Sequence, residues 1–388
     1  MAIEVRERTQ IPTQITWNAE SVFATPQDWE SEFKALGADL EGLGQYHGKL
    51  ADGPSTLLLA LEFIQLLMAR AWKLLIYAVC SYSVDTRQPE AAQRQGQAEG
   101  IFAEAMAAGA FVNPELLSIG EPKLREWMQT EPRLVLYDHH LTDLFRKQQH
   151  VRSAEVEELL GRVMDPFQAV FTTISALVDS DFQFQPAVSA DGRVLPVTQG
   201  TVGTILQDPD REARRTAWES YSDTYLAYKN TLANNLSASI RQNVYRMRAR
   251  RHSSSLQMAL FKDNIPEPVF HNLIETFRKH VETWHRYWKV RRAALGVEQL
   301  HPYDVWAPLT DSPPTVSYQQ AVDWVCEGLA PLGEEYVGRM RKACLEERWV
   351  DVYPNLGKRQ GAFSYGSPGT HPFIVMSFDN DVSGLSTL

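Results

Sequence analysis

Residues 57–79, with the sequence LLLALEFIQLLMARAWKLLIYAV, form a long and mostly apolar run. Four polar residues interrupt it, Glu62, Gln65, Arg70 and Lys73, and on a helix they fall within an arc of about 140°. A helix that is polar on one face and apolar elsewhere is typical of the interior of a large helical protein. Because charged side chains near the centre of a bilayer are costly, we expect a buried helix and no membrane partner.

Helix signals recur along most of the 388 residues, of which 44% are hydrophobic. Thr25 before Pro26 predicts an N-cap and the first position of a helix, and Asp208 before Pro209 predicts another. Further helices are expected at 89–112, 122–129, 130–149, 154–180, 269–295, 318–329 and 333–347. The sequence therefore predicts a mainly α protein with a large core.

Two segments have a different pattern. Residues 182–197 carry strand-like residues on both sides of Ala190, Asp191 and Gly192, which predicts a β-hairpin. Residues 361–378 combine glycines and prolines with two short apolar runs, which predicts a small sheet. We place a domain boundary at the hairpin, so that 1–181 form an N-terminal helical domain and 182–388 belong to a second domain.

Composition excludes several classes of protein. The net charge of −10 argues against a general nucleic-acid binder. Cys80, Cys326 and Cys344 are an odd number of widely spaced cysteines, which indicates neither a disulfide framework nor a cysteine zinc site. The first residues lack the apolar segment of a secretory signal. A cytoplasmic location is expected.

No catalytic or metal-binding motif is present. His271, His280 and His285 share a predicted helix, but their separations of nine and five residues point the side chains in different directions. His139 and His140 are adjacent and diverge as well. No histidine is followed by a glutamate, and the P-loop and G-x-S-x-G patterns are absent. We therefore predict no metal ligand and no catalytic residue in this chain.

Several segments together resemble the oligoendopeptidase F family, a branch of the thimet-oligopeptidase-like zinc metallopeptidases. They are ITWNAESVFATPQDWESEF, DPDREARRTAWESY, HPYDVWAPL and GKRQGAFSYGSPGTHPFIVMSFDNDVSGLSTL, in the family's order and over essentially the whole chain. The resemblance implies a multi-helix oligopeptidase-like architecture, with a helical N-terminal domain and a helical peptidase domain that encloses a channel for short peptides. It also implies zinc-dependent hydrolysis of internal peptide bonds.

The sequence departs from the family at its end. In that family, the strand pair that corresponds to residues 361–364 and 372–378 is followed by a helix that bears His-Glu-x-x-His. Asp379, Asn380 and Asp381 are helix-capping residue types, yet the sequence stops within about two turns. We therefore expect the N-terminal portion of a zinc oligoendopeptidase, with an incomplete peptidase domain at 182–388. Zinc belongs to the complete enzyme, and this chain alone is expected to be zinc-free and inactive.

Two alternatives stay open. One is a non-catalytic peptide-binding or scaffold protein. The other is one half of a two-chain peptidase, whose partner is a C-terminal half that carries the zinc site.

The expected contribution of this chain is substrate positioning. An extended peptide can add to an exposed sheet edge through main-chain hydrogen bonds, and small residues permit its close approach. The candidate edge is 361–364, although an internal strand is an open alternative. Residues 372–378 are apolar on both faces and are expected to form a buried supporting strand. The candidate substrate-binding residues are Gly361, Ala362, Phe363, Ser364, Tyr365 and His371.

Overall fold

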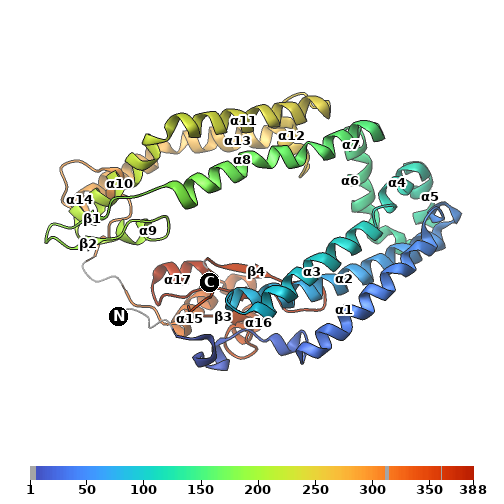
Figure 1. Ribbon diagram of the computed structural model, residues 1–388, viewed down its shortest axis with the longest axis horizontal. Coiled ribbons are helices and arrows are strands. Elements are labelled where there is room, and N and C mark those ends of the chain that lie inside the picture. The colour runs from blue at the N-terminus through green and yellow to red at the C-terminus, as the bar shows by residue number, and fades with distance from the viewer. Residues whose placement is uncertain (1–5, 311–313, 360) are drawn as a thin grey trace. The chain divides into compact units, whose positions relative to one another are not determined.

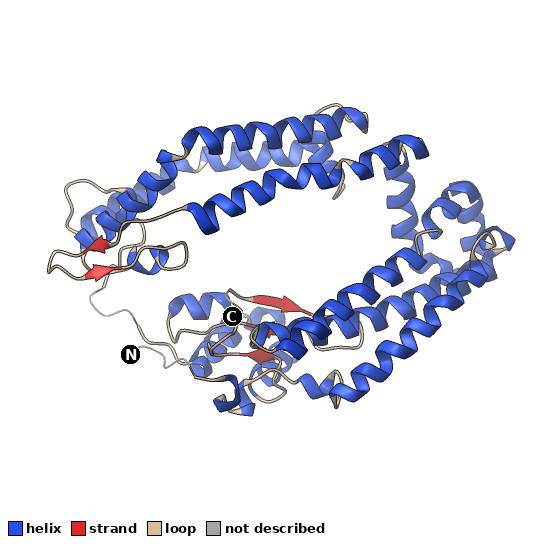
Figure 2. Ribbon diagram, in the orientation of Figure 1, coloured by secondary structure: helices blue, strands red, loops and turns tan. Residues whose placement is uncertain are grey.

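The computed structural model describes residues 6–310, 314–359 and 361–388. The chain is mainly helical, as predicted, and its short strands form two small sheets (Figures 1 and 2). Contacts divide it into two compact units, one of Met1–Arg146 with Pro314–Leu388 and one of Lys147–Pro313. This division reflects contacts alone, so the predicted domain boundary at residue 182 stays a prediction.

The first unit holds the longest helices and the three-stranded sheet. Its helices are α1 (Pro26–Leu40), α2 (Pro54–Val84), α3 (Pro89–Ala108), α4 (Val112–Ile119), α5 (Glu121–Thr130), α6 (Asp138–Gln148), α15 (Tyr318–Gly328), α16 (Glu334–Leu345) and α17 (Val382–Thr387). Its strands are β3 (Val350–Asp351), β4 (Phe363–Tyr365) and β5 (Phe373–Val375).

The second unit contains the β-hairpin and eight further helices among the described residues. The helices are α7 (Ala154–Arg162), α8 (Met164–Ala176), α9 (Val202–Ile205), α10 (Arg211–Ala227), α11 (Lys229–Ala249), α12 (Ser255–Phe261), α13 (Glu267–Lys279) and α14 (Val281–Ala294). The strands are β1 (Ala187–Val188) and β2 (Val194–Leu195), which pair antiparallel at the predicted hairpin.

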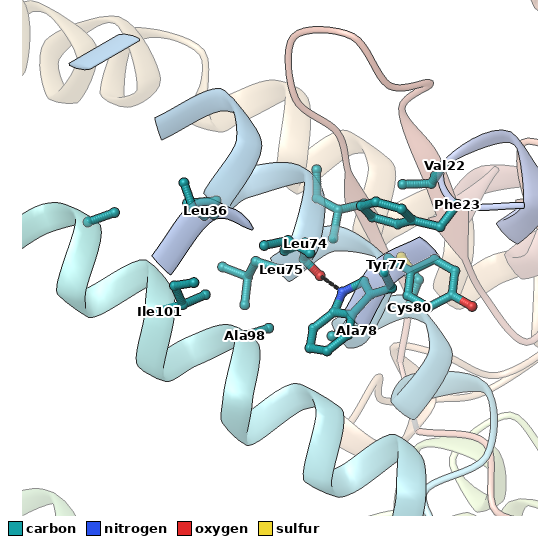
Figure 3. Packing of buried hydrophobic residues seen from close by; sticks show 14 of the residues in the cluster. Val22, Phe23, Leu36, Leu74, Leu75, Tyr77, Ala78, Cys80, Ala98 and Ile101 are labelled. Carbon is teal, nitrogen blue, oxygen red and sulfur yellow. Dashed lines mark hydrogen bonds between the residues drawn. The ribbon is translucent and has the colours of Figure 1, made fainter. Parts of the chain in front are cut away.

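The apolar run at 57–79 lies within α2, which packs against α1 and α3. Leu36 of α1, Leu74 of α2 and Ala98 and Ile101 of α3 meet in one buried cluster (Figure 3). The indole N–H of Trp29 in α1 donates to the Leu74 carbonyl at 3.0 Å, so this buried polar group is satisfied. By length and composition alone α2 could cross a membrane, a test that core helices of soluble proteins also pass.

The predicted polar stripe of α2 is used for pairing with neighbouring segments. Arg70 forms ion pairs with Glu32 at 2.5 Å and with Asp39 at 2.6 Å, both on α1. The Lys73 ammonium lies 4.9 Å from the centroid of the Phe23 ring. Arg70 therefore ties α2 to α1.

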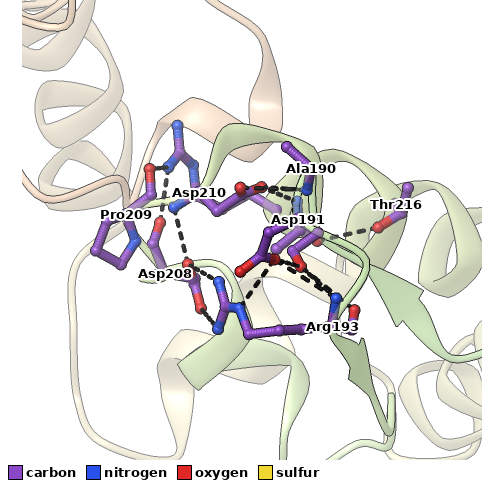
Figure 4. A network of polar contacts seen from close by, with 10 residues as sticks. Ala190, Asp191, Arg193, Asp208, Pro209, Asp210 and Thr216 are labelled. Carbon is purple, nitrogen blue, oxygen red and sulfur yellow. Dashed lines mark hydrogen bonds and ion pairs between the residues drawn. The ribbon is translucent and has the colours of Figure 1, made fainter.

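The start of α1 follows the sequence prediction, whereas the start of α10 does not. Thr25 caps α1, and Pro26 is its first residue. The predicted N-cap at Asp208 is wrong, because α10 begins at Arg211 and Asp210 accepts a hydrogen bond from the Ala213 N–H at 2.8 Å. The Asp208 carboxylate instead accepts from the Asp210 N–H and pairs with Arg193 of the hairpin (Figure 4).

Three arginines hold the loop that contains HPYDVWAPL. Arg211 pairs with Asp304 at 2.8 Å, buried Arg214 donates to the Tyr303 carbonyl at 3.1 Å, and buried Arg291 donates to the Asp304 carbonyl at 3.1 Å. Burial alone would raise the pKa of Asp304, but the hydrogen bonds from Arg211, His301 and Arg214 hold it below its usual value. The arginines thus fix this loop against α10 and α14.

Candidate peptide-binding edge

The small sheet has the strand order β3, β5, β4, with β5 in the centre. β5 runs parallel to β3 and antiparallel to β4. Phe373 and Val375 of β5 are buried, as are Met376 and Phe378 after it. The strand predicted at 372–378 is therefore present and largely buried, but it is shorter than predicted, because β5 ends at Val375.

β4 pairs only with β5 among the described residues, so it lies at the edge of the sheet. The Ile374 N–H donates to the Trp349 carbonyl at 2.8 Å, on the β3 side. Because backbone groups alternate in direction along a strand, Phe373 and Val375 bond toward β4, where they are paired with Tyr365 and Phe363. The backbone N–H and C=O of Ser364 therefore point away from β5, toward the open edge.

The other predicted edge residues contribute differently. Gly361 and Ala362 precede β4 and are exposed, and Gly361 has φ +87°, a backbone conformation that favours glycine. Phe363 is half-buried, with the Arg359 guanidinium 6.0 Å from its ring centroid. The Tyr365 ring packs against Trp72 of α2 with centroids 5.7 Å apart. Ser364 is the exposed residue of the strand itself.

Tyr365 and His371 are packed against aromatic neighbours. Burial raises the pKa of the Tyr365 hydroxyl above its usual value. The His371 ring stacks on Trp349 with centroids 4.5 Å apart and meets Phe373 edge-on. At Gly366, just beyond β4, a Cβ would lie 2.9 Å from the Pro372 Cα, so the close approach of the two chain segments requires glycine.

An apolar cavity of about 370 Å³ adjoins this edge. Its lining comes from α15, α16, the sheet and α17: Val322, Val325, Tyr336, Arg339, Met340, Ala343, Cys344, Trp349, Val350, Ser364, Pro372, Ile374 and Leu388. The Arg339 guanidinium lies 5.6 Å from the Trp349 ring centroid. The Trp349 Nε1 is buried and has no hydrogen-bond partner within the described part of the chain. The cavity suits an apolar side chain.

Sequence reasoning missed this cavity, since it considered only the strands. Of the helices that line it, α15 and α16 precede β4 and α17 follows it, and no local pattern links them to that strand. The available signal was the apolar periodicity of α15 and α16, which predicts buried faces but not what they face.

A buried charge cluster supports the end of β3. The Lys358 ammonium lies 2.7 Å from one oxygen of Asp351, and Arg8 lies 2.6 Å from the other. Burial lowers the pKa of the Lys358 ammonium below its usual value. Burial alone would raise the pKa of the Asp351 carboxyl, but the hydrogen bond from Arg8 and the positive charge of Lys358 hold that pKa below its usual value. Lys358 also donates to the Tyr353 carbonyl at 2.7 Å, so it anchors the loop that leads to β4.

Comparison with known proteins identifies the chain's relatives. A model described as peptidase family M3 matches residues 204–388, and one described as oligopeptidase F matches residues 115–184. Oligopeptidase PepF of Bacillus subtilis is 35% identical over 388 residues, all of this chain and 58% of that protein. The chain belongs to the oligoendopeptidase F branch of peptidase family M3. The resemblance inferred from the sequence is confirmed.

Other M3 relatives extend the agreement to the fold. Group B oligopeptidase PepB of Streptococcus agalactiae is 32% identical over 98% of this chain and 63% of its own length. A crystal structure of a peptidase from Chlamydophila abortus superposes with a TM-score of 0.84 at 27% identity, over 99% of this chain and 64% of that one. The crystal structure of oligoendopeptidase-F from Enterococcus faecium superposes with a TM-score of 0.62 at 27% identity. The match covers 82% of this chain and 60% of that one. The chain thus spans about 58–64% of the length of these relatives.

The zinc that characterises M3 enzymes does not fit the residues described. Within residues 6–310, 314–359 and 361–388, no three side chains of histidine, cysteine, aspartate or glutamate gather closely enough to hold a metal ion. A protein zinc site needs three or four such ligands. We therefore assign no metal ligand and derive no chemical step through zinc.

Proposed function

We propose that this chain is part of a zinc-dependent oligoendopeptidase of family M3 and that its β4 edge binds the backbone of short peptide substrates. The observation that carries the proposal is the outward-facing backbone of Ser364 at an open sheet edge. Main-chain pairing at such an edge tolerates many sequences, which suits an enzyme that cuts varied peptides.

The neighbouring cavity supplies the second element of the proposal. A peptide strand paired with β4 directs alternate side chains to opposite faces of the sheet. Ser364 lines the cavity, so one apolar side chain of the peptide enters it on the α16 side. Gly361, Ala362, Phe363, Tyr365 and His371 form the surroundings of this subsite.

We also propose that the chain by itself neither holds zinc nor cleaves peptides. Zinc-assisted hydrolysis needs a metal that activates water and polarises the carbonyl, and a carboxylate that accepts the proton. The scattered donor side chains of the described residues support this proposal. We further propose two domains, at 1–181 and 182–388. A cytoplasmic location is also proposed, and the three free cysteines support it.

Backbone-directed binding is tested with a fluorescein-labelled nonapeptide rich in alanine and phenylalanine. Ser364→Pro removes the outward N–H without removing a bond to β5, so the peptide Kd should rise at least tenfold. Ser364→Ala keeps the backbone and is the matched control, with binding close to that of the wild type. Equal binding by both variants, or no binding by the wild type, would contradict the proposed edge.

A second measurement does not depend on the folding of the proline variant. Two series of peptides are N-methylated, one at odd and one at even positions. In a paired strand, only one of the two series loses the N–H groups that donate hydrogen bonds to β4. One of the two methylated series should therefore bind the unaltered chain at least tenfold more weakly than the other. Identical affinities would show that the peptide does not pair as a strand.

The catalytic part of the proposal needs metal analysis and an activity assay. The chain is equilibrated with zinc chloride, dialysed and assayed for bound metal and for cleavage of an internally quenched peptide. We expect far less than one zinc per chain and no cleavage. One zinc per chain together with peptide cleavage by the purified protein would overturn this part.

A further inference from the structure

Two histidines from distant parts of the second unit stack on one another. His150 lies just before α7 and His252 just after α11, and both side chains are half-buried. Their ring centroids are 3.6 Å apart, with 19° between the ring planes. Phe261 of α12 packs edge-on against both rings, with centroids 4.5 Å and 5.3 Å away. The pair thus joins residues 147–153, which we call the entry segment because they begin the second unit, to the turn between α11 and α12.

Hydrogen bonds fix the orientation of the two rings. The Nδ1 atom of His150 lies 2.9 Å from the Arg250 carbonyl oxygen, and that of His252 lies 2.6 Å from Gln257 Oε1. Because both of these oxygens only accept, each neutral ring carries its proton on Nδ1. A second proton is therefore taken up at Nε2, and its uptake leaves both hydrogen bonds in place. What changes on protonation is the charge of the pair.

The immediate surroundings of the pair carry more positive than negative charge. Arg152 of the entry segment donates to the Ala249 carbonyl at the end of α11. Arg250 donates to the His150 carbonyl at 3.4 Å and binds both carboxylate oxygens of Glu157 in α7 at 2.9 Å. α12, with the sequence SLQMALF, has no charged residue. Glu157 is thus the carboxylate that offsets the two arginines beside the rings.

The other charged residues near these segments leave this balance unchanged. Arg246, in the last turn of α11, lies over the Phe167 ring of α8, with its guanidinium 5.4 Å from the centroid. Lys147, at the start of the entry segment, adds one more positive charge. The remaining ones are exposed: Glu155, Arg162, Arg248, Arg251, Lys262 and Asp263.

The pKa values of the cluster follow from these contacts. Burial lowers the pKa of His252 below its usual value; the hydrogen bond to Gln257 opposes this shift, and the charges of His150 and Arg250 add to it. Burial alone would raise the pKa of the Glu157 carboxyl, but the hydrogen bonds from Arg250 and from the Arg152 N–H hold it below its usual value. Glu157 therefore stays charged in mildly acidic solution, and the histidines are the groups that change.

Acid should therefore weaken the stack. Since folded His252 holds its proton less tightly than the unfolded chain does, the contact is fully stable above about pH 6.5 and weakens as the pH falls below that value. Once both rings are charged, two positive charges face each other beside Arg250. Like charges this close repel strongly near a protein surface.

We propose that His150 and His252 form a pH-dependent latch, which holds the entry segment against the turn between α11 and α12 at neutral pH and releases it in mildly acidic solution. The ion pair of Arg250 with Glu157 keeps α7 in place, so the release is confined to the connection between α6 and α7. The inference does not rest on the proposed peptide-binding edge, since β4 belongs to the first unit.

Hydrogen exchange with mass spectrometry on the full chain follows the entry segment. The His150 and Val151 N–H groups are bonded within the segment, and that of Arg152 donates to Glu157. After correction for the intrinsic pH dependence of exchange, protection of 147–153 should fall at least tenfold between pH 7.5 and pH 5. Protection of 213–227 in α10, a reference helix of the same unit without histidine, should change less than threefold.

Variants assign the effect to the pair. His252→Gln has no titrating ring, so protection of the entry segment should be the same at pH 7.5 and pH 5. His252→Arg places a fixed positive charge beside His150 and should lower protection at least tenfold at pH 7.5. His285→Gln, at an exposed position of α14, is the matched control and should keep the pH dependence of the unaltered chain.

A second measurement does not depend on the folding of the arginine variant. With ¹³C-labelled histidine rings, NMR should show the signals of His150 and His252 titrating in two steps, because charge on one ring opposes charge on the other. In His150→Gln, the His252 signal should titrate in a single step. Single-step titration of both rings in the unaltered chain would overturn the latch.

The exchange experiment can also overturn the inference. Equal protection of the entry segment at both pH values in the unaltered chain would do so, as would a loss at pH 5 that persists in His252→Gln. An equal loss in α10 would show that the second unit unfolds as a whole and that no local latch exists.

Discussion

At the scale of single residues, the end of α2 meets a loop that is distant in sequence at Gly357. A Cβ at this glycine would overlap Asp85 Oδ1 and lie 2.5 Å from Arg87 Nε. The Thr86 N–H donates to the Gly357 carbonyl at 2.8 Å. The loop that carries Lys358 thus lies against α2, and glycine is needed there for space as well as for its φ of +77°.

Substitution of Gly357 should therefore lower the free energy of unfolding by more than the backbone strain of a positive φ alone. Gly369 also has a positive φ, +84°, but open space around it. We expect Gly369→Ala to lose about 1 kcal/mol of unfolding free energy and Gly357→Ala about 2 kcal/mol more, through overlap with Asp85 and Arg87. Urea unfolding of both variants measures the difference. Equal losses would mean that the loop moves aside freely.

Asp85 should make stability depend on acid pH. Hydrogen bonds from Arg87, and then from Gln88, lower the pKa of this carboxyl to about 2 from 3.8. Because the folded state holds the proton less tightly, the stabilisation is complete above pH 4 and is lost as the pH falls through about 2. At neutral pH it amounts to about 2 kcal/mol.

Asp85→Asn should remove that contribution. Its unfolding free energy should be lower than that of the wild type at pH 6, and the gap should narrow between pH 4 and pH 2. Asp52→Asn, at an exposed position, is the control. A constant gap across this range would show that Asp85 is not the group responsible.

At the scale of elements, local capping signals set some boundaries and distant pairs set others. The capping box of Thr25 and Asp28 starts α1 where the sequence predicts, because all its atoms lie within four residues. The start of α10 moves from Asp208 to Asp210 because Arg193, on the hairpin, pairs with Asp208. A capping residue type does not locate the helix end from sequence alone when its side chain can instead pair with a residue distant in sequence.

The N-cap of α1 should contribute measurably to the free energy of unfolding. Thr25→Ala removes the acceptor for the Asp28 N–H and should lower the unfolding free energy by about 1 kcal/mol. Ser31→Ala, on the exposed surface of the same helix, should change it by less than half as much. Indistinguishable denaturation curves for the two variants would exclude a stabilising cap.

At the scale of the whole molecule, the hydrophobic core is distributed unevenly. Three buried clusters lie in the first unit, including those built on α2. Among the described residues, the second unit has one smaller cluster around Ala187, Ile205 and Tyr303. Among their described residues, α11, α12 and α13 have none that is buried.

This distribution predicts unequal local stability. Amides of 57–84 should exchange with solvent at least a hundredfold more slowly than those of 230–279, because opening α2 exposes far more apolar surface. Hydrogen exchange with mass spectrometry on the isolated chain measures both regions at once. Similar protection in the two regions would indicate that they unfold together.

The sequence by itself determined the mainly helical class, the hairpin, the small sheet and the M3 family. Each of these rests on patterns read within a few turns or strands, such as the polar stripe of α2 and the short apolar run that contains β5. The family followed from several such segments in a fixed order.

Only the tertiary structure decided that β4 is an edge strand. The pattern GAFS suits an internal strand equally well, and the strand order depends on β3, whose two residues are too few to be recognised in sequence. The cavity beside Ser364 and the Lys358 to Asp351 pair likewise depend on segments that meet only on folding. Contacts between distant segments cannot be predicted from a local sequence pattern. The free energy of such a contact depends on which other segment packs there, and the spacing of residues within one segment does not specify that partner.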